Sequence, residues 1–296
     1  IWNAARFVLG ACEDYSAAEK CAPPSAADAW IVSRLQRTET AVSDALDIYR
    51  FDLAASALHH FLWNEYCDWY LEIAKITLRG ETPACRRAQQ TLILVLESAL
   101  RLLHPLMPFI TEELWEKIAP LAGVSGEVSI MRAPWPQAQA EKINENAEAE
   151  MAKLTAAAAA CRKLRAELGA PPASKPALLV CGEDAAFAPH AAALLKLCGF
   201  AEFEMRRELP PDMPQTAAAG FVFALDLRAE KSETRARVEK QLQKAESDAA
   251  ALQKTLTNES FTARAPAEVV EKKRARLAAA QKESAAARAL LEKLGG

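Results

Sequence analysis

The stretch RLLHPLMPFITEELW, from Arg101 to Trp115, decides the fold of the first part of this chain. It places Pro105 and Pro108 inside an otherwise helical apolar pattern. Proline lacks the donor for a helical hydrogen bond and disfavours helical geometry in the residue before it, so one helix should end just before Pro105. The first turn of a helix tolerates proline, so a second helix should begin at once, with Glu112 and Glu113 near its positive end. The stretch therefore predicts two helices joined by a sharp bend.

Three longer helices are indicated upstream of this bend. Ser25 with Asp28 resembles a capping box, and the apolar positions after it keep the spacing of one buried face: Ile31, Leu35, Val42, Leu46 and Tyr49. Asp52 is expected to cap a second helix, whose buried face includes Trp69. Thr82 followed by Pro83 predicts the start of a third. Short connections between such helices favour an antiparallel bundle.

The middle of the chain mixes helical and extended patterns. An alanine-rich helix is expected from about Glu141 to Leu168. Short apolar runs at Ala177 to Cys181, Ala201 to Met205 and Phe221 to Leu225 predict a three-stranded sheet, with a helix from about Ala185 to Leu197. We therefore expect a small α/β unit.

The last part has the pattern of long, charged, alanine-rich helix with two apolar seams at heptad spacing. The first seam comprises Val238, Leu242, Ala245, Ala249, Leu252 and Leu256, and the second Val270, Leu277, Ala280, Ala287, Leu291 and Leu294. The polar stretch TNESFTARAP, residues 257–266, lies between them. This pattern predicts an antiparallel two-helix coiled coil, with Pro266 at the start of its second helix.

Composition shifts mark the same boundaries. All six tryptophans precede Gln137. Residues 226–296 carry 15 Lys and Arg against 11 Asp and Glu, although the whole chain has a net charge of −3. We therefore predict a mainly α protein with a helical domain at 1–137, an α/β connector at 138–225 and a coiled-coil arm at 226–296, the basic arm being the candidate for phosphate contact.

Composition also excludes several classes of protein. With 51% hydrophobic and 25% charged residues, the chain is ordinary for a globular protein, and no apolar run reaches the length of a membrane-spanning helix. The seven cysteines are scattered without a C-x-x-C pair, which favours reduced thiols in a cytosolic protein over a metal site. Because the chain begins at Ile1 without an initiator Met or a targeting pattern, we expect it to be part of a longer protein.

The prolines at the bend, with WNEYCDWYLEIAK at Trp63 to Lys75 and IWNAARFVL at Ile1 to Leu9, resemble the anticodon-binding bundle of the class I aminoacyl-tRNA synthetases for branched aliphatic amino acids. The stretch NESFTARAPAEVVEKKRARL, residues 258–277, narrows the resemblance to the C-terminal part of the bacterial valyl enzymes. RKLRAELGAPPASKP, residues 162–176, is similar to their connecting segment. The resemblance covers essentially the whole chain.

This resemblance implies a cytoplasmic, monomeric protein whose partner is valine tRNA. The bundle would read the anticodon and the arm would brace the elbow of the tRNA. The sequence has no His-x-Gly-His motif, no Lys-Met-Ser-Lys-like loop and no glycine-rich phosphate loop. We therefore expect no catalytic, metal or cofactor site in the chain. ATP would serve the parent enzyme through catalytic and editing domains that precede it.

The resemblance places the anticodon contacts on Arg34, Arg37, Arg50, Phe51 and Asn64. Guanidinium groups can contact phosphates or base edges, and an exposed aromatic ring can stack on an unpaired base. The alternative is that each arginine pairs with a neighbouring carboxylate such as Glu39 or Asp47, and that Asn64 serves only the bundle.

Contacts of the arm are assigned by the same resemblance to the basic run Lys272, Lys273, Arg274 and Arg276, and to Arg264 near the hairpin turn. A basic run of this kind is otherwise the solvated face of a helix. Two further interpretations stay open: the equivalent part of an isoleucyl or leucyl enzyme, and a coiled-coil adaptor that binds protein and no RNA.

Overall fold

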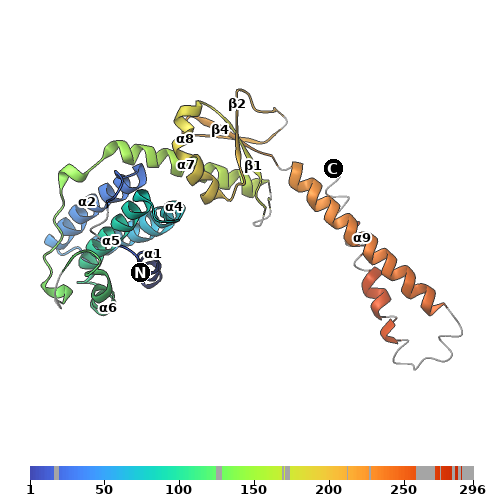
Figure 1. The fold of residues 1–296 in the computed structure, drawn as a ribbon, viewed down its shortest axis with the longest axis horizontal. Coiled ribbons are helices and arrows are strands. Elements are labelled where there is room, and N and C mark those ends of the chain that lie inside the picture. Colours follow the sequence, from blue (N-terminus) through green and yellow to red (C-terminus); the bar gives the residue numbers. More distant parts are fainter. Residues whose placement is uncertain are drawn as a thin grey trace.

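The protein is mainly helical with one small sheet, as predicted (Figure 1). The computed structural model describes residues 1–16, 20–124, 129–168, 170, 174–211, 213–226, 228–257, 271–273, 275–281, 284–285 and 288. Within them a helical bundle is joined by one long helix to a sheet, and a helical arm projects from the far side of the sheet. No helix among these residues has the length and apolar content to cross a membrane.

The bundle contains the helices predicted around the proline bend, several of which start as expected, together with a further helix at its start. Its elements are α1 (Trp2–Ala11), α2 (Ala26–Asp47), α3 (Phe51–His59), η1 (His60–Tyr70), α4 (Leu71–Thr77), α5 (Pro83–Leu103) and α6 (Pro108–Ile118). Ser25 and Asp28 form the full capping box, and the Thr82 hydroxyl accepts from the Cys85 N–H at 3.1 Å. The prediction that Asp52 caps α3 is wrong, because the N-cap residue is Arg50. The Asp52 carboxylate instead accepts hydrogen bonds from the Arg50 guanidinium.

The proline bend is confirmed, since α5 ends at Leu103 and α6 begins at Pro108. The expectation that Glu112 and Glu113 lie at the positive end of the second helix is wrong, because the first turn of α6 contains no acidic residue. The Glu112 carboxylate instead accepts from the Ser129 hydroxyl at 2.9 Å and from the Ile130 N–H at 3.2 Å. It thereby fastens the short helix η2 (Ile130–Arg132) to α6.

The segments α3, η1 and α4 form one continuous helix, whose middle part is π-helical, as the bond from the Leu71 N–H to the Tyr66 carbonyl shows. The wider turns bring Tyr66 and Tyr70 fully into the core, where their hydroxyls donate to the Leu92 carbonyl at 3.0 Å and to Asp28 Oδ1 at 2.6 Å. Trp69, predicted on the buried face, is only half-buried. A pattern of 3.6 residues per turn could not anticipate this change of face.

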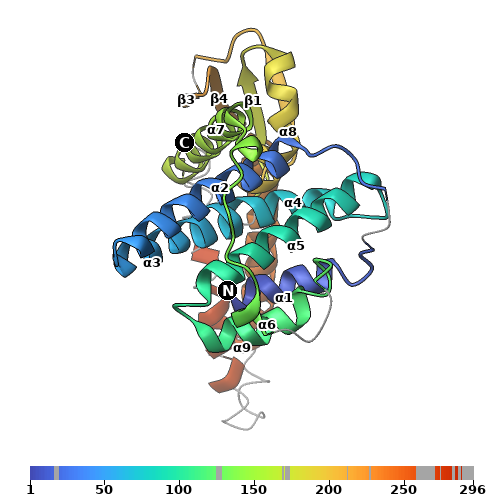
Figure 2. The same cartoon turned by 90° about the vertical axis from the view of Figure 1, so that its left-hand side faces the viewer.

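Helix α7 (Glu145–Glu167) starts with the Asn144 side chain as its cap and packs against both α2 and the sheet (Figure 2). The sheet has four strands in the order β2-β1-β4-β3, so the three-stranded prediction is corrected. Strand β1 (Ala177–Cys181) pairs parallel with β2 (Phe203–Arg206) and antiparallel with β4 (Phe221–Asp226). Helix α8 (Asp184–Cys198) packs Phe187 against the aromatic rings of β2 and β4.

The missed strand is β3 (Gln215–Ala218), which pairs antiparallel with β4. Its small, alanine-rich sequence carries little intrinsic preference for a strand. The two-residue turn is formed by Ala219 and Gly220, both with positive φ, and lacks the Asn-Gly or Asp-Gly pair that signals a hairpin. Residues 215–218 therefore form a strand because they pair with β4, and not because of their own strand preference.

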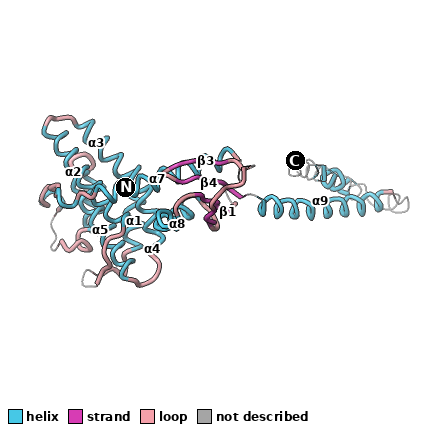
Figure 3. The backbone as a smooth tube through the Cα atoms, turned by 90° about the horizontal axis from the view of Figure 1, so that it is seen from above, coloured by secondary structure: helices cyan, strands magenta, loops and turns pink. Residues whose placement is uncertain are grey.

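Helix α9 (Arg228–Leu256) projects away from the bundle and the sheet, and at 1.5 Å per residue it is about 43 Å long (Figure 3). A second helical segment lies along it among residues 271–288. The Arg288 Nε donates to Glu246 Oε1 at 3.1 Å, while Thr255 and Lys273 line a common hollow nearer the other end of α9. The two segments are therefore antiparallel.

The coiled-coil packing itself stays a prediction. On α9 the seam residue Ala245 is buried, and Leu242, Ala249, Leu252 and Leu256 are half-buried. On the second segment Leu277 and Ala280 are also half-buried. The turn at 258–266, with Pro266, lies outside the described residues, as do the backbone positions of Val270, Ala287, Leu291 and Leu294 and the side chain of Val238.

Replacing Tyr70 by Phe should lower the free energy of unfolding by about 1–3 kcal/mol, because the buried Asp28 Oδ1 loses its hydroxyl donor. The matched change is Tyr66→Phe, which removes the same hydroxyl from a backbone carbonyl and should cost less, about 0.5–1.5 kcal/mol. Urea denaturation measures both. Equal decreases in the free energy of unfolding would show that the hydrogen bond from Tyr70 to the Asp28 carboxylate contributes no more than the one from Tyr66 to a backbone carbonyl.

Candidate nucleic-acid interface

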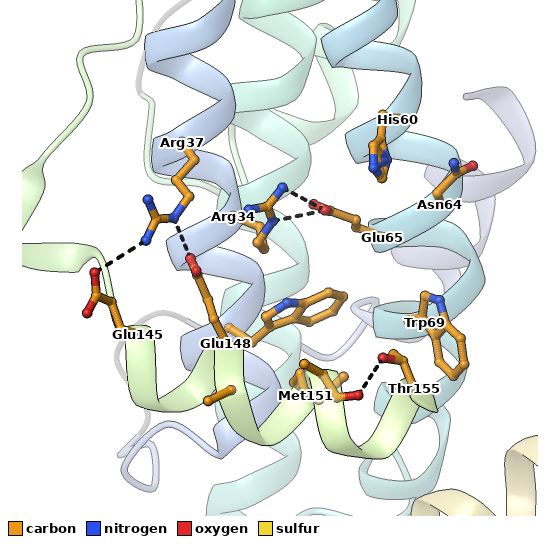
Figure 4. Close-up of a pocket in the computed structure, with 13 residues that line it drawn as sticks. Arg34, Arg37, His60, Asn64, Glu65, Trp69, Glu145, Glu148, Met151 and Thr155 are labelled. Carbon is orange, nitrogen blue, oxygen red and sulfur yellow. Dashed lines mark hydrogen bonds and ion pairs between the residues drawn. The ribbon is translucent and has the colours of Figure 1, made fainter. Parts of the chain in front are cut away.

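Helix α2 positions the first two predicted site residues, Arg34 and Arg37, one turn apart on the side that faces η1 and α7 (Figure 4). The Arg34 Nε and Nη2 both lie 2.9 Å from Glu65 Oε1. The π-helical segment places Glu65 on the inner side of its helix, where only 9% of the residue is exposed. Arg34 is therefore held by an ion pair with a neighbouring helix.

Glu65 is unevenly satisfied. Its Oε1 accepts a hydrogen bond from the Arg34 guanidinium, whereas Oε2 is buried and has no hydrogen-bond partner among the described residues. Burial raises the pKa of Glu65, and the nearby guanidinium of Arg34 offsets only part of that rise. A buried carboxylate oxygen without a hydrogen-bond partner lowers the stability of the fold. A rearrangement of Arg34 would therefore change the free energy of this pair.

Arg37 is tied to the start of α7. Its Nε lies 2.7 Å from Glu148 Oε1 and its Nη2 lies 3.8 Å from Glu145 Oε1. The Ser33 hydroxyl donates to the same Glu148 oxygen at 2.6 Å. Burial alone would raise the pKa of Glu148, but the hydrogen bonds from Arg37 and Ser33 outweigh it and lower that pKa.

These carboxylates differ from the partners that the sequence suggested. Pairing of the arginines was predicted correctly as an alternative, but Glu39 and Asp47 are not the partners. Glu65 and Glu148 are 31 and 111 residues away from the arginines that they bind. Only the fold could bring them together.

A groove of about 650 Å³ runs between α2, η1 and α7 and is lined by both arginines. Asn64, predicted as a site residue, is exposed and lines the same groove together with His60 and Trp69. The guanidinium of Arg162 lies over the Trp69 ring at 5.1 Å from its centroid. The groove therefore offers donors, acceptors and aromatic faces, with its cations already paired.

Arg50 and Phe51 lie at the turn between α2 and α3, at the outer end of the bundle (Figures 2 and 3). Phe51 is 55% exposed. Arg50 donates from Nε and Nη2 to the two carboxylate oxygens of Asp52, at 2.8 and 2.7 Å. These hydrogen bonds lower the pKa of Asp52 to about 2. We name this surface, residues 48–53, the bundle tip.

The bundle tip also holds a residue that sequence reasoning placed wrongly. Tyr49 was predicted on the buried face of α2, but the helix ends at Asp47 and the tyrosine is 80% exposed. Its φ of 59° lies in the left-handed region. The spacing that continued the apolar pattern to Tyr49 carried no sign that the helix stops two residues earlier.

On the arm, Lys272 and Arg276 are exposed and Lys273 is half-buried. Lys273 and Arg276 line the hollow between the two helical segments, together with Asp248 and Thr255. Arg264 and Arg274 lie outside the described residues. The arm and the bundle tip lie at opposite ends of the molecule (Figures 1 and 3).

Comparison with known proteins identifies the class. Residues 28–180 match the family model described as the anticodon-binding domain of tRNA ligase. The matched region includes most of α2, together with η1 and α7, which line the groove, and it includes the bundle tip. The chain therefore belongs to the family of tRNA ligases that carry this domain.

A second match narrows the kind of ligase that the chain resembles. Residues 232–295 match the model described as the valyl tRNA synthetase tRNA binding arm. The chain is 41% identical over 293 residues to the valine–tRNA ligase of Dechloromonas aromatica, a match that covers 94% of this chain and 31% of the relative. It is 43% identical over 285 residues to that of Laribacter hongkongensis, covering 94% and 30%. For Neisseria meningitidis serogroup A the figures are 39% over 302 residues, 99% and 32%. The chain thus spans about a third of the length of the curated relatives that it matches.

Replacing Arg50 by Gln should raise the pKa of Asp52 from about 2 toward the ordinary aspartate value near 3.9, because the two charged hydrogen bonds are removed. A titration of the Asp52 carboxyl by NMR measures the change. The matched variant Phe51→Leu keeps both ion-pair partners and should leave that pKa low. An Asp52 pKa that is the same with and without Arg50 would show that the pair does not form in solution.

Proposed function

We propose that this chain is the tRNA-binding part of a valine–tRNA ligase. The helical bundle reads the anticodon of valine tRNA, and the arm braces the elbow of the folded tRNA. The observation that carries the proposal is the order of two different matches on one chain, an anticodon-binding domain followed by a tRNA-binding arm. The spatial separation of bundle and arm supports it, because two distant contacts fix the orientation of one large ligand.

The parent enzyme would attach valine to tRNA in an ATP-dependent reaction, as a class I synthetase. Valine and ATP would bind in catalytic and editing domains outside this chain, and the chain would contribute by positioning the acceptor end. We propose that the parent acts as a monomer in the cytoplasm. All three of these relatives are valine–tRNA ligases, which supports this assignment over an isoleucyl or leucyl enzyme.

Three functional parts are proposed: the anticodon domain at 1–137, the connector at 138–225 and the arm at 226–296. Helix α7 belongs to the connector by this division, yet it contacts α2 through Glu148. The family match to the anticodon-binding domain extends through residue 180 and so includes α7. We therefore propose that α7 transmits the position of the bundle to the connector.

Two surfaces of the bundle are proposed to meet the anticodon loop. The groove offers Arg34, Arg37 and Asn64, and the bundle tip offers Arg50 and Phe51. All three arginines are ion-paired in the structure. A base edge or a phosphate would thus share or displace a carboxylate, which favours selective contact over general attraction of phosphate.

The arm is proposed to bind phosphate through Lys272, Lys273 and Arg276, with Arg264 and Arg274 in the same role. The excess of positive charge in residues 226–296 and the exposure of Lys272 and Arg276 support this. The competing function is a protein-binding adaptor, which the hairpin of the arm would also suit. Ionic strength separates the two, because phosphate contacts weaken steeply with salt while an apolar seam hardly responds.

Binding of a valine tRNA transcript to the full chain should weaken about 5- to 100-fold when its anticodon bases are changed, since each specific base contact contributes about 1–3 kcal/mol. Filter binding at two salt concentrations measures both affinities. Equal affinity for the two transcripts would remove the anticodon-reading role. No binding of either transcript at low salt would favour the adaptor.

The double variant Lys272→Ala, Arg276→Ala should reduce the slope of log affinity against log salt by about one unit for each phosphate that is no longer neutralised. The penalty should be the same for transcripts with intact and altered anticodons. A charge-matched control is Lys153→Ala, Lys163→Ala on α7, where both lysines already pair with glutamates of their own helix. A slope that falls equally in both variants would show that the arm holds no particular contact.

A further inference from the structure

We propose that Tyr49 is a base-stacking residue of the bundle tip, held in an unfavourable backbone conformation so that its ring faces outward. This inference rests on the proposed tRNA-binding function and names one further contact for it. Three independent features of Tyr49 carry it: its exposure, its place in a helix-ending motif, and the character of its neighbours.

The first feature is exposure without a structural use. Tyr49 is 80% exposed, so its ring contributes little to the core. Among the described residues its side chain has neither a hydrogen-bond partner nor a ring contact, in contrast to Tyr66 and Tyr70, whose hydroxyls are both satisfied in the core. An aromatic side chain that is this exposed is available to a ligand.

The second feature is the backbone. The Tyr49 N–H donates to the Leu46 carbonyl at 2.9 Å, and the Arg50 N–H donates to the Ala45 carbonyl at 2.8 Å. These two bonds are the pair that closes a helix in the Schellman motif, with Tyr49 at the position that adopts the left-handed conformation. Glycine is the usual residue there, because a side chain makes this conformation unfavourable.

The chain itself supplies the comparison. Helix α8 ends in a related way: the Phe200 N–H donates to the Leu195 carbonyl at 2.9 Å, as the Arg50 N–H does to Ala45, and the left-handed position, with a φ of 69°, is occupied by Gly199, whose own N–H also donates to Leu195. At the end of α2 the same conformation, with a φ of 59°, carries a tyrosine. The tyrosine therefore occupies a position that glycine would suit better, so the geometry of the helix end gives no reason for an aromatic residue there.

The third feature is the setting of the ring. Ile48, Phe51 and Leu53 are exposed beside it, so the bundle tip presents apolar and aromatic faces at the outer end of the bundle. The cation of this turn, Arg50, is held by Asp52 through both carboxylate oxygens. Such a surface suits the flat face of an unpaired base rather than a phosphate, and the tip lies inside the matched anticodon-binding domain.

The test compares variants that separate the ring from the backbone. Tyr49→Gly and Tyr49→Asn remove the ring and relieve the left-handed conformation, so both should raise the urea midpoint of the full chain. The same variants should weaken binding of a valine tRNA transcript about five- to hundred-fold, as expected for the loss of one base–aromatic stack. Tyr49→Phe keeps the ring and should bind as the original chain does.

Two further measurements define the contact. Because stacking involves no ion pair, the loss in Tyr49→Gly should be the same at low and high salt, unlike the loss from the arm variants. A transcript with abasic nucleotides in the anticodon loop should bind the original chain and Tyr49→Gly equally. More stable variants with weakened, salt-independent binding of the intact transcript would establish the proposal.

Other results would overturn it. Unchanged tRNA affinity in Tyr49→Gly, while the original chain still discriminates anticodons, removes the stacking role and leaves the proposed function standing. A loss in Tyr49→Phe equal to that in Tyr49→Gly assigns the contact to the hydroxyl instead. A lower urea midpoint for Tyr49→Gly refutes the unfavourable backbone. Loss of self-association in sedimentation, with RNA affinity intact, assigns the tip to a protein contact. If the original chain does not discriminate anticodons at all, the proposed function fails first.

Discussion

The packing of α7 against both α2 and the sheet, supported by contact of α4 with α8, holds the bundle and the sheet together. Along α7, small and apolar side chains are buried in a single stripe, from Met151 and Leu154 to Cys161 and Leu164. Its first turns bind α2 through Glu148, and its last turns bind the end of α8, where the Arg165 Nη1 donates to the Cys198 carbonyl at 2.6 Å. These buried residues of α7 belong to one apolar cluster that includes residues of the bundle and of the sheet, so the two units share a continuous core. Any tilt of α7 would move the bundle relative to the sheet from which the arm departs.

The charges around α2 follow from that packing. When α7 and η1 close on α2, Arg34 and Arg37 leave bulk water in part, and each must be compensated by a carboxylate from the element that covers it. The result is a groove whose cations are neutralised at rest. The arm is different, because Lys272 and Arg276 remain exposed in a region of net positive charge. On the proposed function, the paired groove would make selective contacts and the exposed cations of the arm would make electrostatic ones, and the two should respond to salt in different ways.

The bundle tip adds a third kind of surface, in which an exposed aromatic side chain sits on a residue whose left-handed backbone conformation is unfavourable for any residue except glycine. A helix that ends with a residue in the left-handed conformation is more stable when that residue is glycine, as Gly199 is at the end of α8. The tip of α2 carries Tyr49 instead, next to exposed Phe51. Strain of this kind persists only where the surrounding structure holds it in place, and here the two backbone bonds of the turn and the packed body of α2 do so.

The sequence by itself determined the features that short-range chemistry controls. The capping box at Ser25, the cap at Thr82 and the bend between Leu103 and Pro108 all rest on hydrogen bonds and steric limits within a few residues. The resemblance to the tRNA-ligase family could also be recognised from the sequence, because the motifs that carry it are contiguous stretches of residues. Only the tertiary structure decided the partners of Arg34 and Arg37, the π-helical register that buries Glu65, the alanine-rich strand β3 and the exposure of Tyr49. The first three of these depend on which distant segment packs against a residue, and local periodicity carries no information about that packing. Tyr49 is exposed because α2 ends two residues before it, and the apolar spacing gave no sign of that end.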